Sequence, residues 1–148
     1  MICIVDYGVG NIQAFLNLFN RLGIKAERAS TKKSLNLASH LVLPGVGHFD
    51  RAMKKLNSSG IREPLEDLVL GSKIPLLGIC VGMQMLAEES DEGILPGLGW
   101  IPGKVRAFSK NPKCSKLSLP HMGWNTLTLK KSYLLSAKEN EKFAQFYF

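Results

Sequence analysis

The sequence has little of what several classes of protein require. Its 148 residues include three cysteines, at positions 3, 80 and 114, an odd number without the spacing of zinc ligands. Free thiols in a reducing compartment and no metal site are therefore expected. No apolar run approaches the roughly 20 residues that span a membrane, and the start lacks the basic segment of a signal peptide. We therefore expect a cytoplasmic protein that does not enter a membrane.

Negative charge is scarce in the C-terminal third. Residues 104–148 carry nine Lys and Arg against Glu139 and Glu141, which accounts for the whole net charge of +7. A basic surface can bind nucleic acid or an acidic partner. Because no aromatic interleaving or nucleic-acid-binding motif accompanies the charge, we expect solvated strands and loops rather than a nucleic-acid partner.

Apolar runs and amphipathic segments alternate from residue 2 to residue 88. This alternation predicts an α/β fold with a mainly parallel sheet flanked by helices. The expected strands cover residues 2–5, 25–29, 40–43 and 74–79. The expected helices begin at the caps Asn11 and Ser30 or Thr31, and at residues 49, 64 and 81. The first helix places one apolar stripe in the core: Ile12, Phe15, Leu16, Phe19 and Leu22.

The C-terminal part has a different pattern of apolar and polar residues. A Gly- and Pro-rich loop over residues 93–103 precedes alternating segments at 104–108 and 127–129 and an aromatic run at 143–148. These predict an added antiparallel part. Glu88, Glu89 and Asp91, just before the loop, are expected to be solvated surface.

The stretch 75–86 organises the chain. A short buried strand ends at Cys80, a helix over 81–88 follows, and Gly78 and Gly82 stand two residues on either side of the cysteine. This is the G-x-C-x-G form of a nucleophile elbow, a sharp turn that leaves no room for neighbouring side chains. The amides at the start of the helix would favour a thiolate and could hold an oxyanion. A buried structural cysteine is the alternative.

Three more segments join the elbow in a resemblance. The stretches 78–84, 6–11, 43–47 and 120–125 together resemble class I (triad) glutamine amidotransferases, and among them the glutaminase subunits of imidazole glycerol phosphate synthases. The resemblance runs the length of the chain. It implies one amidotransferase domain over residues 1–148 and no metal or organic cofactor.

The resemblance also implies roles for single residues. Cys80 would attack the carboxamide of glutamine, giving glutamate and ammonia. The loop at 44–47 could be a plain strand-to-helix turn, but the resemblance favours an oxyanion loop, with donors at Val46, Gly47 and Val81. The implied substrate-binding residues are Gly45, Gln84 and Glu92. Ammonia would pass to a cyclase subunit of barrel fold in a heterodimer, whose interface would include Asn11, His121 and Trp124.

The catalytic base is missing from the expected pattern. The family carries a His-x-Glu motif after its last strands, and this sequence ends before one. His48-Phe49-Asp50 fits the letters of a His-x-Asp motif but belongs to a helix start, where capping is the simpler role. A C-terminally incomplete domain is therefore expected. The alternatives are a catalytically incompetent binding or regulatory subunit, and a glutaminase of another synthase, such as one that aminates a surface sugar.

Overall fold

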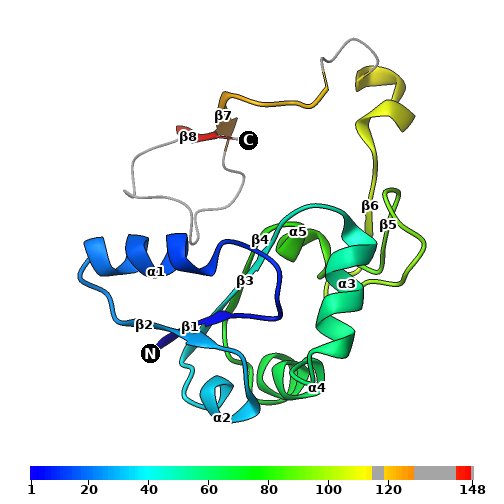
Figure 1. The fold of residues 1–148 in the computed structure, drawn as a ribbon. Helices are drawn as coiled ribbons and strands as arrows, with labels where there is room; N and C mark the ends of the chain where they lie inside the picture. Colours follow the sequence, from blue (N-terminus) through cyan, green and yellow to red (C-terminus); the bar gives the residue numbers. More distant parts are fainter. Residues whose placement is uncertain (115–118, 129–142, 148) are drawn as a thin grey trace. The chain divides into compact units, whose positions relative to one another are not determined.

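The structure is a computed structural model, and it describes residues 1–114, 119–128 and 143–147. The chain divides into two compact units, Met1–Ala107 and Phe108–Phe148. The first unit contains the longer sheet and most of the helices, and the second contains a two-stranded sheet (Figure 1). Each unit is described by itself.

A four-stranded parallel sheet forms the centre of the first unit. In spatial order its strands are β2 (Ala26–Ala29), β1 (Ile2–Val5), β3 (His40–Gly45) and β4 (Leu76–Cys80). All three pairings are parallel. The parallel α/β prediction is confirmed, and the continuously apolar strand β1 occupies an interior position, where both faces are covered.

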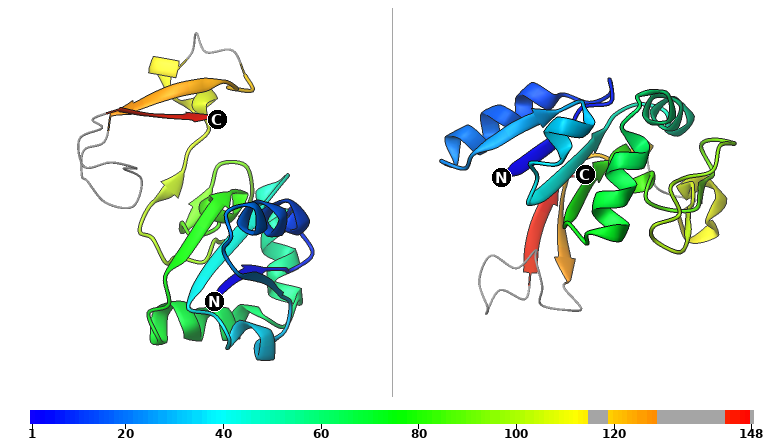
Figure 2. Two further views of the ribbon diagram at one scale, coloured as in Figure 1. Left: turned by 90° about the vertical axis from the view of Figure 1, so that its left-hand side faces the viewer. Right: turned by 90° about the horizontal axis from the view of Figure 1, so that it is seen from below.

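Helices cover both faces of this sheet (Figure 2). One face packs Ile4 and Val42 against α1 (Ile12–Arg21). The other face packs Val5 and Leu43 against further helices of this unit: α2 (Lys32–Leu35), α3 (Phe49–Ser58), α4 (Arg62–Glu66) and the π-helical turn η1 (Asp67–Gly71). The period-two alternation of a strand thus sends neighbouring residues into two separate cores.

The predicted helix caps are present. The Oδ1 atom of Asn11 accepts a hydrogen bond from the Ala14 amide at 3.1 Å. Thr31 forms a capping box with Ser34. In the predicted apolar stripe of α1, Ile12 is buried, but Leu22 lies just after the end of the helix and is exposed. The expectation that Leu22 belongs to the core was wrong.

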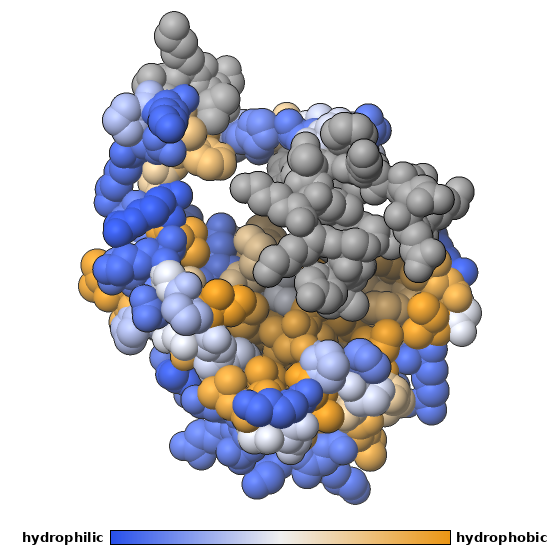
Figure 3. Space-filling model, turned by 180° about the vertical axis from the view of Figure 1, so that it is seen from behind, coloured by the Kyte–Doolittle hydropathy of each residue, from blue (hydrophilic) through white to orange (hydrophobic). Residues whose placement is uncertain are grey.

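Strand β4 differs from the buried strand that the apolar run predicted. It covers Leu76–Cys80 rather than 74–79, and it forms an edge of the described sheet. One of its faces is open, since Leu77 is 55% exposed. A view from behind shows a broad apolar area on the molecule (Figure 3). An apolar run of this length therefore did not distinguish an edge strand from a central one.

The helix after the elbow is shorter than predicted. α5 covers Val81–Gln84, whereas the sequence predicted a helix to residue 88. Backbone amides of the loop at 97–101 bond the carbonyls of the next four residues: Leu98 to Met85, Ile101 to Leu86, Gly99 to Ala87 and Gly97 to Glu88. These carbonyls are turned to the loop rather than continuing the helix, so the helix ends at Gln84.

The chain after α5 forms a small parallel pairing, not an antiparallel one. β5 (Glu89–Ser90) pairs with β6 (Lys104–Val105) in parallel register, so the strand expected at 104–108 is two residues long. The second unit contains the 3₁₀ turns η2 (Phe108–Lys110) and η3 (Pro112–Cys114). It also contains the antiparallel pair of β7 (Trp124–Thr128) and β8 (Phe143–Tyr147). The added antiparallel part is thus confirmed for this pair, while Leu129 and Phe148 lie outside the described residues.

Candidate active site

The predicted nucleophile elbow is present as a sharp turn between β4 and α5. Cys80 ends the strand and precedes the helix, with φ 55° and ψ −124°. A residue other than glycine rarely adopts this backbone conformation. The conformation costs of order 1–3 kcal/mol and persists only where the surrounding structure imposes it. The Cys80 side chain is exposed, whereas Cys3 is buried in the core. The alternative of a buried structural cysteine at position 80 is therefore wrong.

Close backbone packing explains the glycines beside the cysteine. A Cβ atom on Gly78 would lie 2.6 Å from the Cα atom of Met83, and one on Gly82 would overlap the carbonyl oxygen of Leu43. The first turn of α5 can therefore rest on the backbone of β3 and β4 only when both positions lack a side chain. This close backbone contact explains why glycines stand two residues before and two residues after Cys80.

The end of β3 lies beside the elbow. In the parallel ladder Gly45 is the partner of Cys80, and a Cβ atom on Gly45 would overlap the backbone nitrogen of Gly82. Val46 follows as an exposed residue, and Gly47 has φ 82°, a value that favours glycine. Two of the predicted residues, Gly45 and Val81, thus lie next to Cys80. The chain then runs from Gly45 through the rest of the predicted oxyanion loop.

Tyr7 belongs to this site although the sequence analysis did not single it out. Its hydroxyl donates to the Pro44 carbonyl oxygen at 2.8 Å and lies 3.5 Å from the Met85 sulfur. The side chain is 4% exposed, and burial raises the pKa of the hydroxyl. The sequence pattern at 6–11 rests on its glycines and does not predict a role for Tyr7. A buried tyrosine needs a hydrogen-bond partner for its hydroxyl, and this need is the signal that could have identified Tyr7.

Glu92 binds the residue that begins α3, and Gln84 lies on the helix that follows the elbow. The Oε2 atom of Glu92 accepts a hydrogen bond from the Phe49 amide at 2.9 Å and so binds the start of α3, just after the oxyanion loop. Gln84 is the last residue of α5 and is partly buried. Within the described residues its side chain makes no hydrogen bond. Glu92 thus already has one backbone partner, whereas the amide of Gln84 has none.

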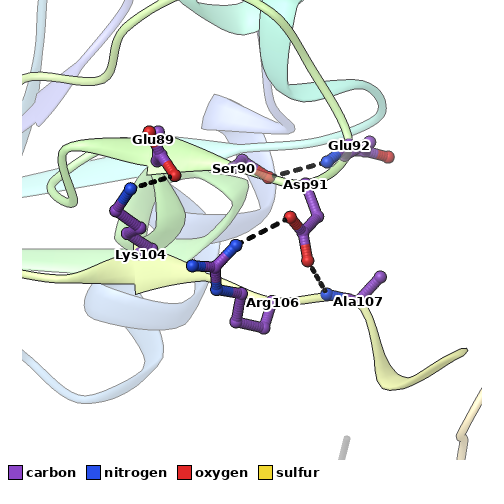
Figure 4. Close-up of polar contacts among 7 residues, drawn as sticks. All are labelled: Glu89, Ser90, Asp91, Glu92, Lys104, Arg106 and Ala107. Atoms are coloured by element: carbon purple, nitrogen blue, oxygen red, sulfur yellow. Dashed lines mark hydrogen bonds and ion pairs between the residues drawn. The ribbon is translucent and has the colours of Figure 1, made fainter. Parts of the chain in front are cut away.

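Of the three acidic residues expected at the solvated surface, Glu88 is exposed as predicted, Glu89 is half-exposed in an ion pair, and Asp91 is structural. Glu89 pairs with Lys104 at 2.6 Å, and Asp91 pairs with Arg106 at 3.2 Å while accepting from the Ala107 amide at 3.0 Å (Figure 4). The side chain of Asp91 is 9% exposed, so its assignment to the solvated surface was wrong. Ser90 Oγ accepts a hydrogen bond from the Glu92 amide at 3.2 Å. This bond fixes the backbone of Glu92, whose carboxylate is predicted to bind the substrate.

The three histidines each have another partner. His48 precedes α3, and its Nδ1 atom accepts from the Asp50 amide at 3.2 Å, as its predicted capping role requires. His40 Nδ1 lies 3.1 Å from Ser39 Oγ. In the second unit, His121 Nε2 lies 3.1 Å from Asn125 Nδ2, and the ring packs edge-on against Phe108. These contacts assign no histidine the role of base for Cys80.

The predicted interface residues lie at the surface. Asn11 and His121 are exposed, and Trp124 is 71% exposed with its ring packed at right angles to Tyr147. Within the described residues no group of three or more His, Cys, Asp and Glu side chains could hold a metal ion. The helices of the same residues include none that is long and apolar enough to cross a membrane.

The parallel sheet and the cysteine elbow define the class of the protein. The model of the class-I glutamine amidotransferase family matches residues 3–147, and the chain belongs to this family. A solved glutamine amidotransferase has the same fold, with a TM-score of 0.71 at 20% identity over the whole chain and 70% of that protein.

Within this family, the chain is similar to one kind of subunit in particular. The chain is 56% identical to the imidazole glycerol phosphate synthase subunit HisH of Bdellovibrio bacteriovorus, over all of this chain and 72% of that protein. It is 46% identical to the subunit of the same name in Leptospira interrogans, over 97% of this chain and 71% of that protein.

Proposed function

We propose that this chain is the glutaminase subunit of an imidazole glycerol phosphate synthase and passes ammonia to a cyclase subunit in histidine biosynthesis. The observation that carries the proposal is the exposed thiol of Cys80, held at φ 55° directly beside Gly45. The similarity to HisH subunits over the whole chain supports the choice of synthase.

The chemistry follows from the position of the thiol. The Cys80 sulfur attacks the carboxamide carbon of glutamine, an S–C bond forms, and the carbonyl electron pair moves to oxygen. Amides near Val46, Gly47 and Val81 stabilise this oxyanion, a contribution of about 10²–10³ in rate for each donor in comparable enzymes. The C–N bond then breaks, and the nitrogen leaves as ammonia carrying the proton that the Cys80 thiol gave up. Water hydrolyses the thioester to glutamate and regenerates the thiol.

The substrate is held by groups that do not react. A carboxylate is the natural partner of the α-ammonium group of glutamine, and Glu92 supplies one on the loop that binds the start of α3. Gln84 lies one helical turn beyond Cys80 and offers a neutral amide. None of these steps needs a metal or an organic cofactor, and the proposal includes neither.

The partner is a cyclase subunit of barrel fold, bound as a heterodimer. Asn11, His121 and Trp124 belong to the proposed interface, which their exposure supports. The family model spans both units, so we treat residues 1–148 as one amidotransferase domain. The free thiols of Cys3, Cys80 and Cys114 suit a reducing compartment, and the proposed location is the cytoplasm.

The proposal is tested by glutamate release from glutamine by this chain mixed with the matching cyclase subunit. Cys80→Ala should abolish release, and Cys114→Ala, which removes a free thiol of the second unit, should leave it unchanged. Release that survives Cys80→Ala would contradict the proposal. If the wild-type chain binds the cyclase and releases no glutamate, the chain is a binding or regulatory subunit. If it binds only the partner of another synthase, the choice of synthase is wrong.

A further inference from the structure

The two ladders on either side of β3 end at different places. The pairing of β1 with β3 ends at Ile4 and Val42, whereas the pairing of β3 with β4 continues to Gly45 and Cys80. Pro44 therefore lies on a buried part of β3 that extends beyond its last β1 partner. A buried carbonyl there needs a donor from elsewhere, because an unsatisfied one costs about 1–3 kcal/mol.

The hydroxyl of Tyr7 is that donor. The turn after β1 brings Tyr7 back over the end of β3, where its hydroxyl donates to the Pro44 carbonyl oxygen at 2.8 Å. Two further contacts lie beside this hydrogen bond. A Cβ atom on Gly10 would lie 3.1 Å from the Cβ atom of Pro44, and the sulfur of Met85, the residue after α5, lies 3.5 Å from the hydroxyl. A side chain thus replaces the backbone donor that β1 no longer provides.

We propose that Tyr7 is a positioning residue for the oxyanion donors beside Cys80, because it fixes the plane of the peptide between Pro44 and Gly45. The carbonyl of Pro44 and the amide of Gly45 belong to one rigid planar unit, so a bond to the first restricts rotation of the second. Gly45 opens the oxyanion loop. This inference rests on the proposed function, since it assigns the loop its catalytic role.

The burial of Tyr7 suits this role. The side chain is 4% exposed, and burial raises the pKa of its hydroxyl, so the group remains a protonated donor across the working pH range. Tyr7 acts through Pro44 and does not touch the reacting atoms. Its loss should therefore weaken stabilisation of the oxyanion without weakening the ground-state contacts of Glu92 and Gln84 with glutamine.

The test compares Tyr7→Phe with Met85→Leu in the full chain bound to the cyclase. Tyr7→Phe keeps the ring and removes the hydroxyl, whereas Met85→Leu removes the sulfur contact and keeps the volume. We expect Tyr7→Phe to lower both kcat and kcat/KM for glutamine about tenfold with KM nearly unchanged. Met85→Leu should change kcat less than about twofold. A rise in KM with unchanged kcat would overturn the inference.

Two readouts separate positioning from general damage. Alkylation of Cys80 by iodoacetamide forms a C–S bond and releases iodide without creating an oxyanion, so its rate should be the same in Tyr7→Phe as in the wild type. Amide hydrogen exchange of peptides that cover residues 43–48 should be faster in Tyr7→Phe and unchanged in Met85→Leu. Slower alkylation would indicate a disturbed elbow and overturn the inference.

Failure of the proposed function gives a different pattern. If the wild-type chain with its cyclase releases no glutamate, the glutaminase proposal fails, and hydrogen exchange alone decides the role of Tyr7. Faster exchange at residues 43–48 in Tyr7→Phe only would still support control of the Pro44–Gly45 peptide. Equal exchange in the wild type and Tyr7→Phe would overturn it.

Discussion

Two strand ends meet at the candidate active site, and they are held by different means. β4 ends at Cys80 in a strained turn, and a Cβ atom at Gly78 or Gly82 would meet backbone atoms first. β3 ends at Gly45, and the segments beside its end are held by side chains: Tyr7 on the Pro44 carbonyl and Glu92 on the Phe49 amide. The position of Cys80, the proposed nucleophile, thus follows from close backbone contacts that leave no room for side chains, whereas two side chains hold the segments beside the proposed oxyanion loop.

This difference predicts unequal tolerance of the glycines, and the largest effect is expected at the elbow. Gly82→Ala would drive a Cβ atom into the carbonyl oxygen of Leu43, a backbone atom that cannot move aside alone. We expect a loss of more than about 3 kcal/mol in the free energy of unfolding, measured by urea denaturation.

The matched control for Gly82 is Gly47 in the oxyanion loop. Nothing lies within 4 Å of a Cβ atom at Gly47, and only its φ of 82° opposes a side chain. Gly47→Ala should cost about 1 kcal/mol. Equal losses for the two variants would show that the elbow is not held by packing.

The second effect concerns the two tasks of Glu92. Glu92→Gln keeps an oxygen that can accept from the Phe49 amide but removes the charge that the α-ammonium group of glutamine needs. We expect KM to rise about 10- to 100-fold, which corresponds to the loss of a hydrogen bond to a charged group, with stability nearly unchanged. Steady-state kinetics and thermal denaturation measure the two quantities.

Glu92→Ala removes both tasks and serves as the comparison. It should raise KM as much as Glu92→Gln does and also cost about 1 kcal/mol of stability, because the Phe49 amide at the start of α3 loses its acceptor. An unchanged KM in Glu92→Gln would limit Glu92 to the structural task.

Much of this site could be predicted from the sequence because its signals are local. The spacing of Gly78, Cys80 and Gly82 predicts the elbow, and Asn11 and Thr31 cap the helices that they precede. The alternation of strands and helices also predicts the parallel sheet. The elbow and the caps depend on residues within a few positions of one another, and the sheet is predicted from a succession of such local segments.

The features of the fold and the site that were not predicted depend on the register between segments that are far apart in the sequence. The partner of Tyr7 follows from where the β1–β3 ladder ends, which the composition of neither strand reveals. The side chain of Asp91 is largely covered because β5 pairs with β6 and brings Arg106 to it, a pairing of strands only two residues long. The early end of α5 has the same origin, since a loop beginning 13 residues after Gln84 takes the carbonyls that would have continued the helix.

The third effect is a gain in stability at the nucleophile. Cys80→Gly should raise the free energy of unfolding by about 1–2 kcal/mol, because glycine adopts φ 55° without the strain that a side chain suffers. Cys80→Ala keeps the Cβ atom and therefore the strain, so it should not show the gain. Both variants lack the thiol, and urea denaturation of the pair separates strain from the loss of sulfur. A Cys80→Gly variant no more stable than Cys80→Ala would exclude stored strain.

The smallest effect is a dependence of stability on pH at the start of α3. Asp50 accepts from the Leu95 amide at 3.0 Å and from the Ile94 amide at 3.1 Å. The Leu95 amide is the largest cause that holds the pKa of the Asp50 carboxyl below its usual value, and the Ile94 amide and the charges of His48 and Lys54 add to it. Because the folded pKa is the lower one, the stabilisation is fully present above the unfolded value near pH 4 and is lost as the pH falls through the folded value.

Asp50→Asn tests this dependence because it removes the titration and keeps one acceptor oxygen. The difference in urea midpoint between the wild type and the variant should be larger at pH 6 than at pH 3, because pH 3 lies below the unfolded value, where the stabilisation is being lost. Asp67→Asn is the matched control, since the Asp67 side chain makes no hydrogen bond or ion pair within the described residues. An Asp50 difference that is the same at both pH values would mean that the loop at 94–95 is held by shape rather than charge. Among the described residues, Tyr7 and Glu92 would then be the side chains that hold the segments around the proposed oxyanion loop.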